Sequence, residues 1–271
     1  AGTLGLGKLV VFWDDNGISI DGEVQGWFTD NTPARFEAYG WQVIRDVDGH
    51  DPAEIIQAIE TAKDETERPT LICCRTVIGF GAPNKQGTSA THGSPLGDDE
   101  VKATKEALGW KYPAFEIPSE IYAGWDAKTS GSAAESDWSA RLSAYRQAFP
   151  DLAAEYSRRM SGDLPENWQQ ATNEIISDLQ EAGGDVATRK GSQIALNAFG
   201  PLLSELNCAS AELAPSNNTN WNQSVDVNNG TAEGNNNQIG VREFCKTANS
   251  NALGLHAGFI PYNATYLVFS D

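Results

Sequence analysis

The segment most informative about the fold of this chain reads Lys8-Leu9-Val10-Val11-Phe12-Trp13-Asp14-Asp15-Asn16-Gly17-Ile18. Its apolar, β-branched and aromatic first part predicts a β-strand over residues 8–13, which ends at two acids, an amide and a glycine. Open α/β folds bind ligands at the carboxyl edge of such strands. Asn16 offers a neutral side-chain oxygen there, which hard cations such as Mg²⁺ accept. Because one amide is not a metal site, further ligands must come from elsewhere, for example from chain before residue 1.

The pattern continues as an alternation of strands and helices up to residue 80. Further strands are predicted over residues 41–47 and 69–77. Helices are predicted to begin at Thr32-Pro33, with Thr32 as N-cap and Gly40 as C-cap, and at Asp51-Pro52, with Asp51 as N-cap and Glu54 three residues later. Strand–helix–strand units at this spacing predict a parallel sheet with right-handed crossovers.

A glycine-rich loop follows the third predicted strand and reads Gly79-Phe80-Gly81-Ala82-Pro83-Asn84-Lys85-Gln86-Gly87. Because the predicted strands are parallel, this loop leaves the same sheet edge as Asn16. The chain then continues to His92. A lone histidine in a loop is most often a solvent-exposed ring, but the surrounding glycines and the position after a parallel strand favour a functional role.

The second half of the chain begins with polar helices and ends in a second α/β pattern. Residues 99–188 are predicted to be mainly helical, with one long helix over 138–160 and a domain boundary near 150–165. After Arg189 we expect a helix over 193–199, a short strand before Glu212, irregular structure over the Asn-rich stretch 216–238 and a helix over 241–255. The chain is therefore expected to hold two α/β regions with helices between them.

Composition limits the classes of function. The 271 residues carry a formal net charge of −18, which argues against binding to nucleic acid or to an anionic membrane, because both need clustered Lys and Arg. A few basic residues would still suffice for an anionic substrate. No apolar run approaches the roughly 20 residues that a membrane-spanning helix needs. The cysteines form no Cys-x-x-Cys pair, Cys73 and Cys74 are expected to be buried apolar residues, and a reducing cytosol is the default.

An ordered set of short segments runs through essentially the whole chain. Its members are Leu6-Gly7-Lys8-Leu9, Asp14-Asp15-Asn16-Gly17-Ile18-Ser19-Ile20-Asp21-Gly22, Trp27-Phe28-Thr29-Asp30, Arg35-Phe36-Glu37-Ala38-Tyr39-Gly40-Trp41, Gly79-Phe80-Gly81-Ala82-Pro83-Asn84-Lys85, His92-Gly93-Ser94-Pro95-Leu96-Gly97, Arg189-Lys190-Gly191-Ser192, Leu213-Ala214-Pro215-Ser216-Asn217 and Gly240-Val241-Arg242-Glu243-Phe244. One such segment would be a weak signal. Together, and in this order, they resemble the transketolases, a family of thiamine-diphosphate enzymes.

The resemblance implies an α/β fold with two stacked parallel-sheet domains that bind thiamine diphosphate, both incomplete here. Residues 1–153 would form the C-terminal portion of the diphosphate-binding domain, 154–188 a helical linker and 189–271 the N-terminal portion of the pyrimidine-binding domain. The family's Gly-Asp-Gly motif, whose Asp binds Mg²⁺, is expected before residue 1, and the C-terminal domain after residue 271. We therefore expect an internal piece of a longer polypeptide.

Four residues of the first domain match cofactor positions of the family. Asn16 matches a metal ligand, and Ile18 matches a position whose backbone carbonyl completes the coordination. Ile20 matches an apolar residue near the cofactor. His92 matches a catalytic histidine that contacts the diphosphate, the reacting centre and the substrate. As an alternative, the side chains of Ile18 and Ile20 are simply core residues.

Glu243 is the expected catalytic carboxylate of the second domain. The resemblance implies that it hydrogen-bonds the pyrimidine N1′ of the cofactor and so promotes the imino tautomer that removes the thiazolium proton. Without the family, a Glu early in a helix is more often a partner of the helix dipole. Tyr266 and Phe269 match aromatic residues that stack on the aminopyrimidine, although the usual family residue at Tyr266 is Phe.

Substrate and further cofactor contacts are implied for the same domain. Arg189 and Ser216 match residues that hold the sugar phosphate, for which the planar fork of Arg is suited; the alternative for Arg189 is an exposed charge beside Lys190. Glu212 matches a cofactor-binding Asp. The segment Cys208-Ala209-Ser210-Ala211-Glu212 departs from the family's Gly-Gly-Ser-Ala-Asp and adds bulk where backbone approaches closely.

The implied activity is that of a transferase, reversible transfer of a two-carbon ketol group from a ketose phosphate to an aldose phosphate in the pentose phosphate pathway. Its cofactors would be thiamine diphosphate and Mg²⁺, with Ca²⁺ able to substitute. We expect a cytoplasmic homodimer with its active site at the subunit interface, and neither nucleic acid nor membrane as partner. The alternatives are a related ketol transferase such as a dihydroxyacetone synthase, or an inactive fragment. For the 271 residues alone we expect little or no activity.

Overall fold

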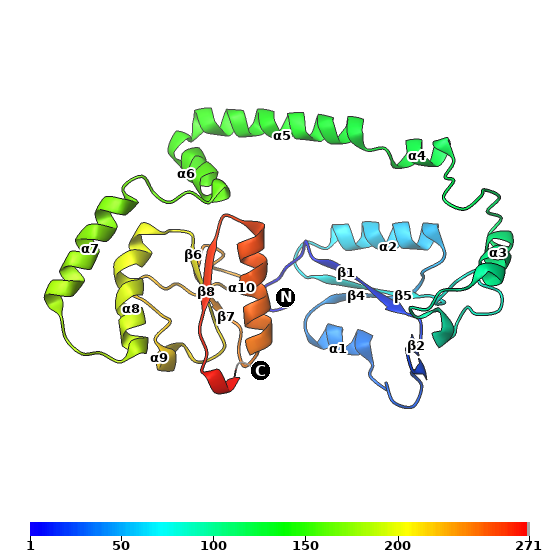
Figure 1. Cartoon of the computed structure of the whole chain (residues 1–271), viewed down its shortest axis with the longest axis horizontal. Helices are drawn as coiled ribbons and strands as arrows, with labels where there is room; N and C mark the ends of the chain where they lie inside the picture. The colour runs from blue at the N-terminus through cyan, green and yellow to red at the C-terminus, as the bar shows by residue number, and fades with distance from the viewer. Residues whose placement is uncertain (270–271) are drawn as a thin grey trace. The chain divides into compact units, whose positions relative to one another are not determined.

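The computed structural model describes residues 1–269 of the chain. These residues fall into two compact units, Ala1–Asp126 and Ala127–Asp271. Each unit contains a three-stranded parallel sheet with helices around it (Figure 1). The prediction of an α/β fold with parallel sheets is therefore confirmed.

The first unit is built on strands in the order β1-β5-β4, with bounds β1 (Val10–Asp15), β5 (Thr70–Arg75) and β4 (Gln42–Asp48). Both pairs are parallel, and β1 and β5 run in register from Val10 opposite Thr70 to Asp15 opposite Arg75. Helix α2 (Pro52–Asp64) covers one face and α1 (Thr32–Ala38) the other (Figure 1). The strands and helices predicted for residues 8–80 are therefore present. The strand β1 begins and ends two residues later than predicted.

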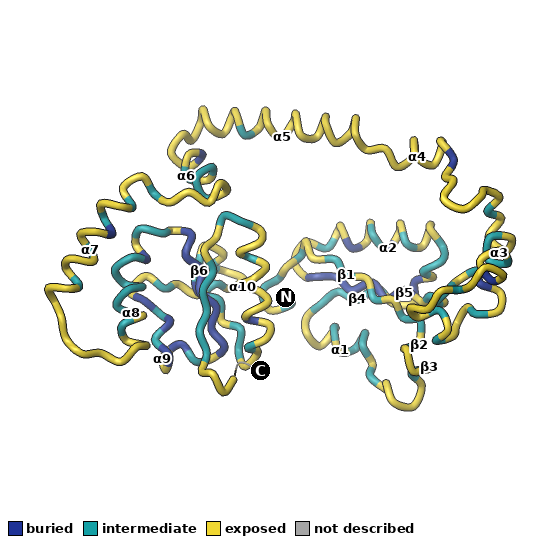
Figure 2. The backbone as a smooth tube through the Cα atoms, in the orientation of Figure 1, coloured by how far each residue is buried: buried dark blue, intermediate teal, exposed yellow. Residues whose placement is uncertain are grey.

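The core of this unit lies between the sheet and α2. Its buried residues are Val47, Ala58, Ala62, Ile72 and Cys74. Figure 2 shows a dark, buried stretch along β5 and dark segments on α2. The expectation that Cys73 and Cys74 are buried is confirmed, because they are 5% and 7% exposed.

The caps of the two helices differ in how well they were predicted. Asp51 caps α2 as expected, since its Oδ1 accepts a hydrogen bond from the backbone N of Ala53 at 2.8 Å. Thr32 is not the cap of α1; the Oδ1 of Asn31 accepts from Ala34 N at 3.1 Å. Thr32 is instead the first helical residue, because Asn31 stands one position earlier with a side chain that caps better than Thr.

The remaining elements of the first unit are short. A small antiparallel hairpin, β2 with β3, follows β1, and a 3₁₀ turn and two helices follow β5; their bounds are β2 (Ile18–Ser19), β3 (Gly22–Glu23), η1 (Ser89–Thr91), α3 (Asp98–Ala107) and α4 (Ser119–Trp125). All of these loops and helices lie after the carboxyl ends of β1 and β5, where the predicted site residues also lie.

The second unit begins with helices that correct one prediction. The single helix expected over 138–160 is two helices, α5 (Lys128–Ala148) and α6 (Pro150–Ser161). The break falls at Phe149-Pro150, because proline lacks the N–H that would continue the ladder of α5 and is accepted at the first position of a new helix. Two further helices follow, α7 (Trp168–Ala182) and α8 (Thr188–Phe199), and the 3₁₀ turn η2 (Gly200–Leu202).

The sheet of the second unit has the order β7-β6-β8, with bounds β7 (Asn236–Gln238), β6 (Leu206–Ser210) and β8 (Ile260–Asn263). All five residues of β6 are buried, as expected for a central strand. The helices α8 and α10 (Glu243–His256) lie on opposite sides of this sheet (Figure 1). The short helix α9 (Ala214–Asn217) follows β6, and η3 (Leu267–Phe269) follows β8.

The Asn-rich stretch corrects a second prediction. Residues 216–238 were expected to be irregular, yet Asn236–Gln238 form the edge strand β7. The side chain of Asn236 is fully buried and donates to Oδ1 of Asp226 at 2.5 Å, and Asn237 donates to Oδ1 of Asn207 at 2.6 Å. Asparagine has low β-propensity, so these amide–amide and amide–carboxylate bonds hold the strand in place of apolar packing.

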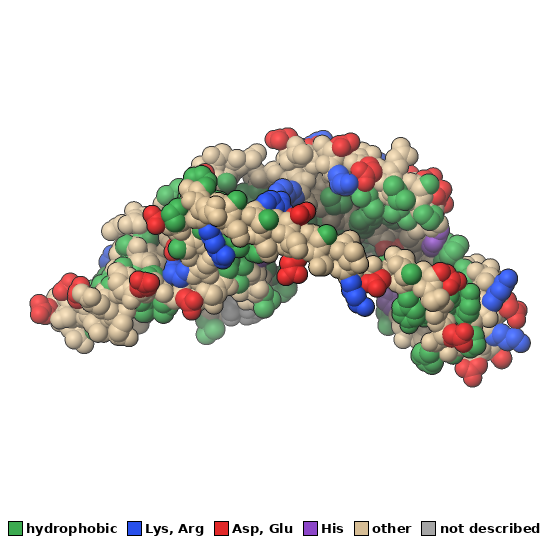
Figure 3. Space-filling view, turned by 90° about the horizontal axis from the view of Figure 1, so that it is seen from above, with side chains coloured by type: hydrophobic (Ala, Val, Ile, Leu, Met, Phe, Trp, Pro, Cys, Tyr) green, Lys and Arg blue, Asp and Glu red, His purple; other side chains and the backbone are tan. Residues whose placement is uncertain are grey.

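An ion-pair network joins α6 to the start of β6. Arg158 donates to both oxygens of Glu205 at 2.9 Å and to both oxygens of Glu155 at 2.8 Å. Elsewhere, Figure 3 shows acidic side chains interspersed with basic ones over the visible face. Within residues 1–269 no helix is both long and apolar enough to cross a membrane.

Candidate functional site

The first group of predicted site residues lies at the carboxyl edge of the first sheet. Since β1 and β5 are parallel neighbours, the chain leaves both at the same edge, with Asp15 opposite Arg75. A hydrogen bond between Thr76 Oγ1 and Asp14 Oδ1 joins the two strand ends. The segment with Asn16 and the glycine-rich loop therefore start side by side, as the sequence predicted.

Asn16 and Ile18 form one tight turn. The Oδ1 of Asn16 accepts a hydrogen bond from the backbone N of Ile18 at 2.9 Å, and Gly17 between them has a φ of +70°. Ile18 then enters the β2–β3 hairpin and is half-buried. Ile20 is 73% exposed at the end of that hairpin, so it is not a core residue of this unit.

The donor atoms of this turn suit a hard cation. Asn16 offers an amide oxygen and Ile18 a backbone carbonyl oxygen, which are ligands typical of Mg²⁺ and Ca²⁺. Residues 1–269 contain no cluster of three or more His, Cys, Asp or Glu side chains that could hold a metal ion. The turn therefore fits as one part of an oxygen-ligated site whose remaining oxygens come from other groups.

The loop between β5 and His92 is held by His50, which the sequence alone did not indicate as a residue of the site. His50 Nε2 accepts a hydrogen bond from Val77 N at 2.8 Å, and its ring stacks on Phe80 at a centroid distance of 3.9 Å. Gly79 has a φ of +66°, and a Cβ there would lie 2.5 Å from Cγ2 of Thr91. Glycine is thus required where the loop passes next to the residue before His92.

Glu100 fixes the middle of the same loop. Its carboxylate is buried and accepts from the side-chain and backbone nitrogens of Asn84, both at 2.9 Å. These two hydrogen bonds lower the pKa of Glu100, because they favour the ionised form. Lys85 Nζ also donates to the carbonyl of Leu96 at 2.6 Å. These hydrogen bonds tie the loop to α3 and to Leu96, while His92 itself is exposed.

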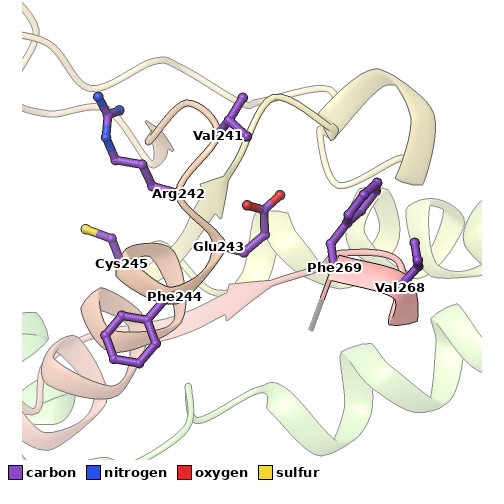
Figure 4. A pocket seen from close by; sticks show the side chains of 7 residues that line it. All are labelled: Val241, Arg242, Glu243, Phe244, Cys245, Val268 and Phe269. Atoms are coloured by element: carbon purple, nitrogen blue, oxygen red, sulfur yellow. The ribbon is translucent and has the colours of Figure 1, made fainter. Parts of the chain in front are cut away.

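The second group of predicted residues surrounds the first turn of α10. Glu243 is the first residue of that helix and is half-buried. A pocket of about 470 Å³ opens beside it and is lined by Val241, Arg242, Glu243, Phe244, Cys245, Val268 and Phe269. Figure 4 shows the carboxyl of Glu243 and the ring of Phe269 on the same side of α10, with Phe244 and Cys245 directed away from them. The structure thus brings a carboxylate and an aromatic face together.

Tyr266 and Ser216 are also brought into contact. The Tyr266 hydroxyl lies 2.6 Å from Ser216 Oγ and donates to the Ser216 carbonyl at 3.2 Å. Ser216 belongs to α9, whose start is held by a hydrogen bond from Ala214 N to Ser210 Oγ at 3.1 Å. Hydrogen bonds therefore join the aromatic residue Tyr266 to Ser216, the residue predicted to bind phosphate.

Glu212 and Arg189 are placed less tightly. Glu212 follows β6 with a φ of +71°, which is unusual for a residue other than glycine, and is exposed. Arg189 is exposed in the first turn of α8, and no hydrogen bond joins it to Ser216 within residues 1–269. Cys208 and Ala209 are 1% and 3% exposed, so the strand accommodates the bulk that replaces the family's glycines.

Two family models match this chain in sequence order. The model described as transketolase, thiamine diphosphate binding domain, matches residues 1–165, and the model described as transketolase, pyrimidine binding domain, matches residues 184–271. Transketolase 1 of Vibrio cholerae is 58% identical over 271 residues, and transketolase 1 of Escherichia coli is 56% identical. Each of these alignments covers 100% of this chain and 41% of the relative.

Solved structures agree with these matches. A crystal structure of a transketolase from Pichia stipitis in complex with sedoheptulose-7-phosphate superposes with a TM-score of 0.91 at 37% identity. The transketolase from Leishmania mexicana gives a TM-score of 0.90 at 33% identity. Each superposition covers 99% of this chain and 40% of the solved chain.

Proposed function

The chain belongs to the transketolase family, and we propose that the protein containing it reversibly transfers a two-carbon ketol group from a ketose phosphate to an aldose phosphate, within the pentose phosphate pathway. The observation that carries this proposal is the carboxylate of Glu243 beside the ring of Phe269 in one pocket. That pair is what an aminopyrimidine needs, a hydrogen-bonding acid at its edge and an aromatic face to stack on. The chain spans 41% of the length of the curated relatives named above, so the activity is proposed for the whole protein that contains it.

Thiamine diphosphate with Mg²⁺, or Ca²⁺ in its place, is the proposed cofactor. When bound, thiamine diphosphate supplies the nucleophilic carbon that this reaction requires. Asn16 Oδ1 and the carbonyl of Ile18 would hold the metal, and Ile20 would offer apolar contact at the exposed hairpin. His92 would contact the diphosphate and the substrate. The hydrogen bonds from Asn84 to Glu100 support this role, because they hold the loop that leads from β5 to His92.

The residues of the second unit have complementary proposed roles. Glu243 would share a proton with the pyrimidine N1′ and so set the tautomer of the ring. Tyr266 and Phe269 would stack on the ring, and Glu212 would contact it from the end of β6. Arg189 and Ser216 would bind the phosphate of the sugar, for which a guanidinium fork and a hydroxyl donor are suited.

We further propose the division into a diphosphate-binding portion at residues 1–153, a helical linker at 154–188 and a pyrimidine-binding portion at 189–271. A homodimer with the active site at the subunit interface is part of the same proposal, as is a cytoplasmic location. The location is supported by free thiols at Cys73, Cys74, Cys208 and Cys245, which suit a reducing compartment.

A ketol-transfer assay tests this function. The full-length protein, supplied with Mg²⁺ and thiamine diphosphate, is expected to convert a ketose phosphate such as sedoheptulose 7-phosphate and an aldose phosphate into a donor shortened by two carbons and an acceptor lengthened by two. Mass spectrometry of the sugar phosphates detects both products. Absence of transfer from any ketose phosphate would refute the proposal. The 271 residues alone are expected to show little or no turnover in the same assay.

A further inference from the structure

Lys246 is a buried cation that the roles above leave unexplained. Its side chain is 0% exposed, and lysine is almost never fully buried without a partner of opposite charge. Within residues 1–269 its ammonium has one hydrogen-bond acceptor, the carbonyl oxygen of Ala264 at 2.8 Å, and no carboxylate partner. Burying an ammonium with a single neutral acceptor costs stability, so a functional reason for this lysine is worth seeking.

The carbonyl that Lys246 binds belongs to a segment that has just left the sheet. The pairing of β8 with β6 ends where Asn263 lies opposite Ala209. Beyond that point the Ala264 carbonyl accepts from Lys246 Nζ and, at 3.3 Å, from Nδ2 of Asn217. The hydroxyl of Thr265 is buried and has no hydrogen-bond partner within residues 1–269. The two donors to Ala264 are therefore the main polar tether of residues 264–265.

Three elements of the proposed site meet at this one oxygen. Lys246 lies one turn after Glu243 on α10, and Asn217 is the neighbour of Ser216 on α9. Ala264 stands two residues before Tyr266. A change in either donor would shift Tyr266 relative to the other two elements, because the strand ladder no longer holds this part of the chain.

We propose that Lys246 is a positioning residue, whose ammonium ties residues 264–266 to α10 and so sets Tyr266 and Ser216 relative to Glu243. The ligand that these residues would then meet, an aminopyrimidine and a sugar phosphate, rests on the proposed function. The tether itself does not, and it can be measured in the absence of any ligand.

The proposal predicts two effects of opposite sign in one variant. Lys246→Met removes the buried charge and keeps a side chain of similar length, so the free energy of unfolding is expected to rise. The same variant removes one of the two donors to Ala264, so residues 264–269 are expected to become more mobile. If Lys246 served only the stability of the fold, its replacement by Met would lower the free energy of unfolding and also make residues 264–269 more mobile.

Hydrogen–deuterium exchange of the full-length protein without cofactor, read by mass spectrometry, tests the tether. In Lys246→Met, exchange is expected to speed several-fold in peptides covering residues 214–218 and 264–269 and to stay unchanged in β6 and β7. Asn249→Ala is the control, because it changes an exposed residue of the same helix and leaves the hydrogen bonds of Lys246, Asn263 and Ala264 in place. Unchanged exchange at 264–269, or equal loss of protection throughout the unit, would overturn the proposal.

Asn217→Ala provides a second route if Lys246→Met does not fold. It removes the other donor to the same carbonyl and is expected to give the same local acceleration at 264–269. If Lys246→Met does not fold and residues 264–269 of Asn217→Ala exchange as slowly as in the unsubstituted protein, the segment is held by packing. That result would overturn the proposal.

The full-length enzyme tests the consequence for binding. Lys246→Met is expected to raise the dissociation constant of thiamine diphosphate, measured by calorimetry with Mg²⁺, several-fold while Asn249→Ala leaves it unchanged. Equal affinities in the unsubstituted and Lys246→Met proteins, despite faster exchange, would refute the positioning role. If the unsubstituted protein binds no cofactor, the proposed function fails while the exchange result still judges the tether.

Discussion

The hydroxyl of Tyr266 lies 2.6 Å from Oγ of Ser216, across 50 residues of sequence. Either hydroxyl can be the donor in this contact, and the Tyr266 hydroxyl also lies within hydrogen-bond distance of the Ser216 carbonyl, at 3.2 Å. The Ser216 hydroxyl is therefore engaged in a hydrogen bond inside the protein. A phosphate oxygen would have to compete with Tyr266 for that hydroxyl.

Tyr266→Phe is accordingly expected to act in two directions. Loss of the hydrogen bonds lowers the free energy of unfolding by about 1 kcal/mol. Release of the Ser216 hydroxyl lowers KM for the phosphorylated donor and leaves kcat nearly unchanged. Steady-state kinetics of the full-length protein and urea denaturation check the two effects. An increase in KM would show that Tyr266 orients Ser216 instead of competing for it.

Glu243→Gln is expected to abolish most activity while preserving the fold. The amide keeps the size of the side chain but loses the proton-sharing acid, which is worth about 10²-fold or more in kcat. Circular dichroism checks that α10 is intact, and the ketol-transfer assay measures the loss. Glu233→Gln, an exposed carboxylate of the same unit, is the control and should retain full activity.

Arg158→Met is expected to destabilise the second unit by about 3 kcal/mol, because it leaves the Glu205 carboxylate buried without its partner. The Glu205 side chain is 4% exposed. Thermal or urea unfolding measures the change. Lys63→Met is the comparison: it breaks a surface pair with Glu60 whose side chains are both 62% exposed, and should cost under about 1 kcal/mol.

The same network predicts how stability depends on pH. Hydrogen bonds from Arg158 and Arg159 lower the pKa of Glu155. Burial raises the pKa of Glu205, but hydrogen bonding and attraction to Arg158 outweigh this and the net shift is downward. The unfolded chain therefore binds more protons than the folded chain in acid, so this stabilisation is complete above about pH 5 and is lost as pH falls through the lowered values. Arg158→Met should flatten the pH dependence of the unfolding free energy between about pH 5 and pH 3.

Gly79→Ala is expected to disturb the loop that leads to His92. The left-handed backbone alone costs about 1–2 kcal/mol for alanine, and the added Cβ would lie 2.5 Å from Thr91 Cγ2. Limited proteolysis between residues 79 and 97 should quicken. Gly124→Ala is the matched control: Gly124 is helical, and apart from its chain neighbours and the backbone of its own helix no atom would lie within 4 Å of an added Cβ, so a gain of about 0.5–1 kcal/mol is expected.

The secondary structure of the first unit could be predicted from the sequence because it depends on local patterns of residues. Alternating strands and helices predicted the parallel sheet, Asp51 was identified as the cap of α2, and the adjacency of Asn16 to the glycine-rich loop followed from parallel strands. The prediction was wrong where the local sequence allowed two structures of similar stability. Asn31 displaced Thr32 as a cap one residue earlier, and Pro150 divided a pattern that read as one helix.

The ordered motifs were enough to indicate the family, its cofactor and the residues to examine, because each motif is a local pattern that survives in the one-dimensional chain. The contacts that hold the site residues in place join segments that are far apart in the sequence. His50 meets Val77 across 27 residues, and Ser216 meets Tyr266 across 50. The burial of Lys246 depends on where α10 packs against β6 and β8. Such contacts follow from how distant segments pack, and no local propensity encodes them; the folded chain alone decided which side chains hold the site together.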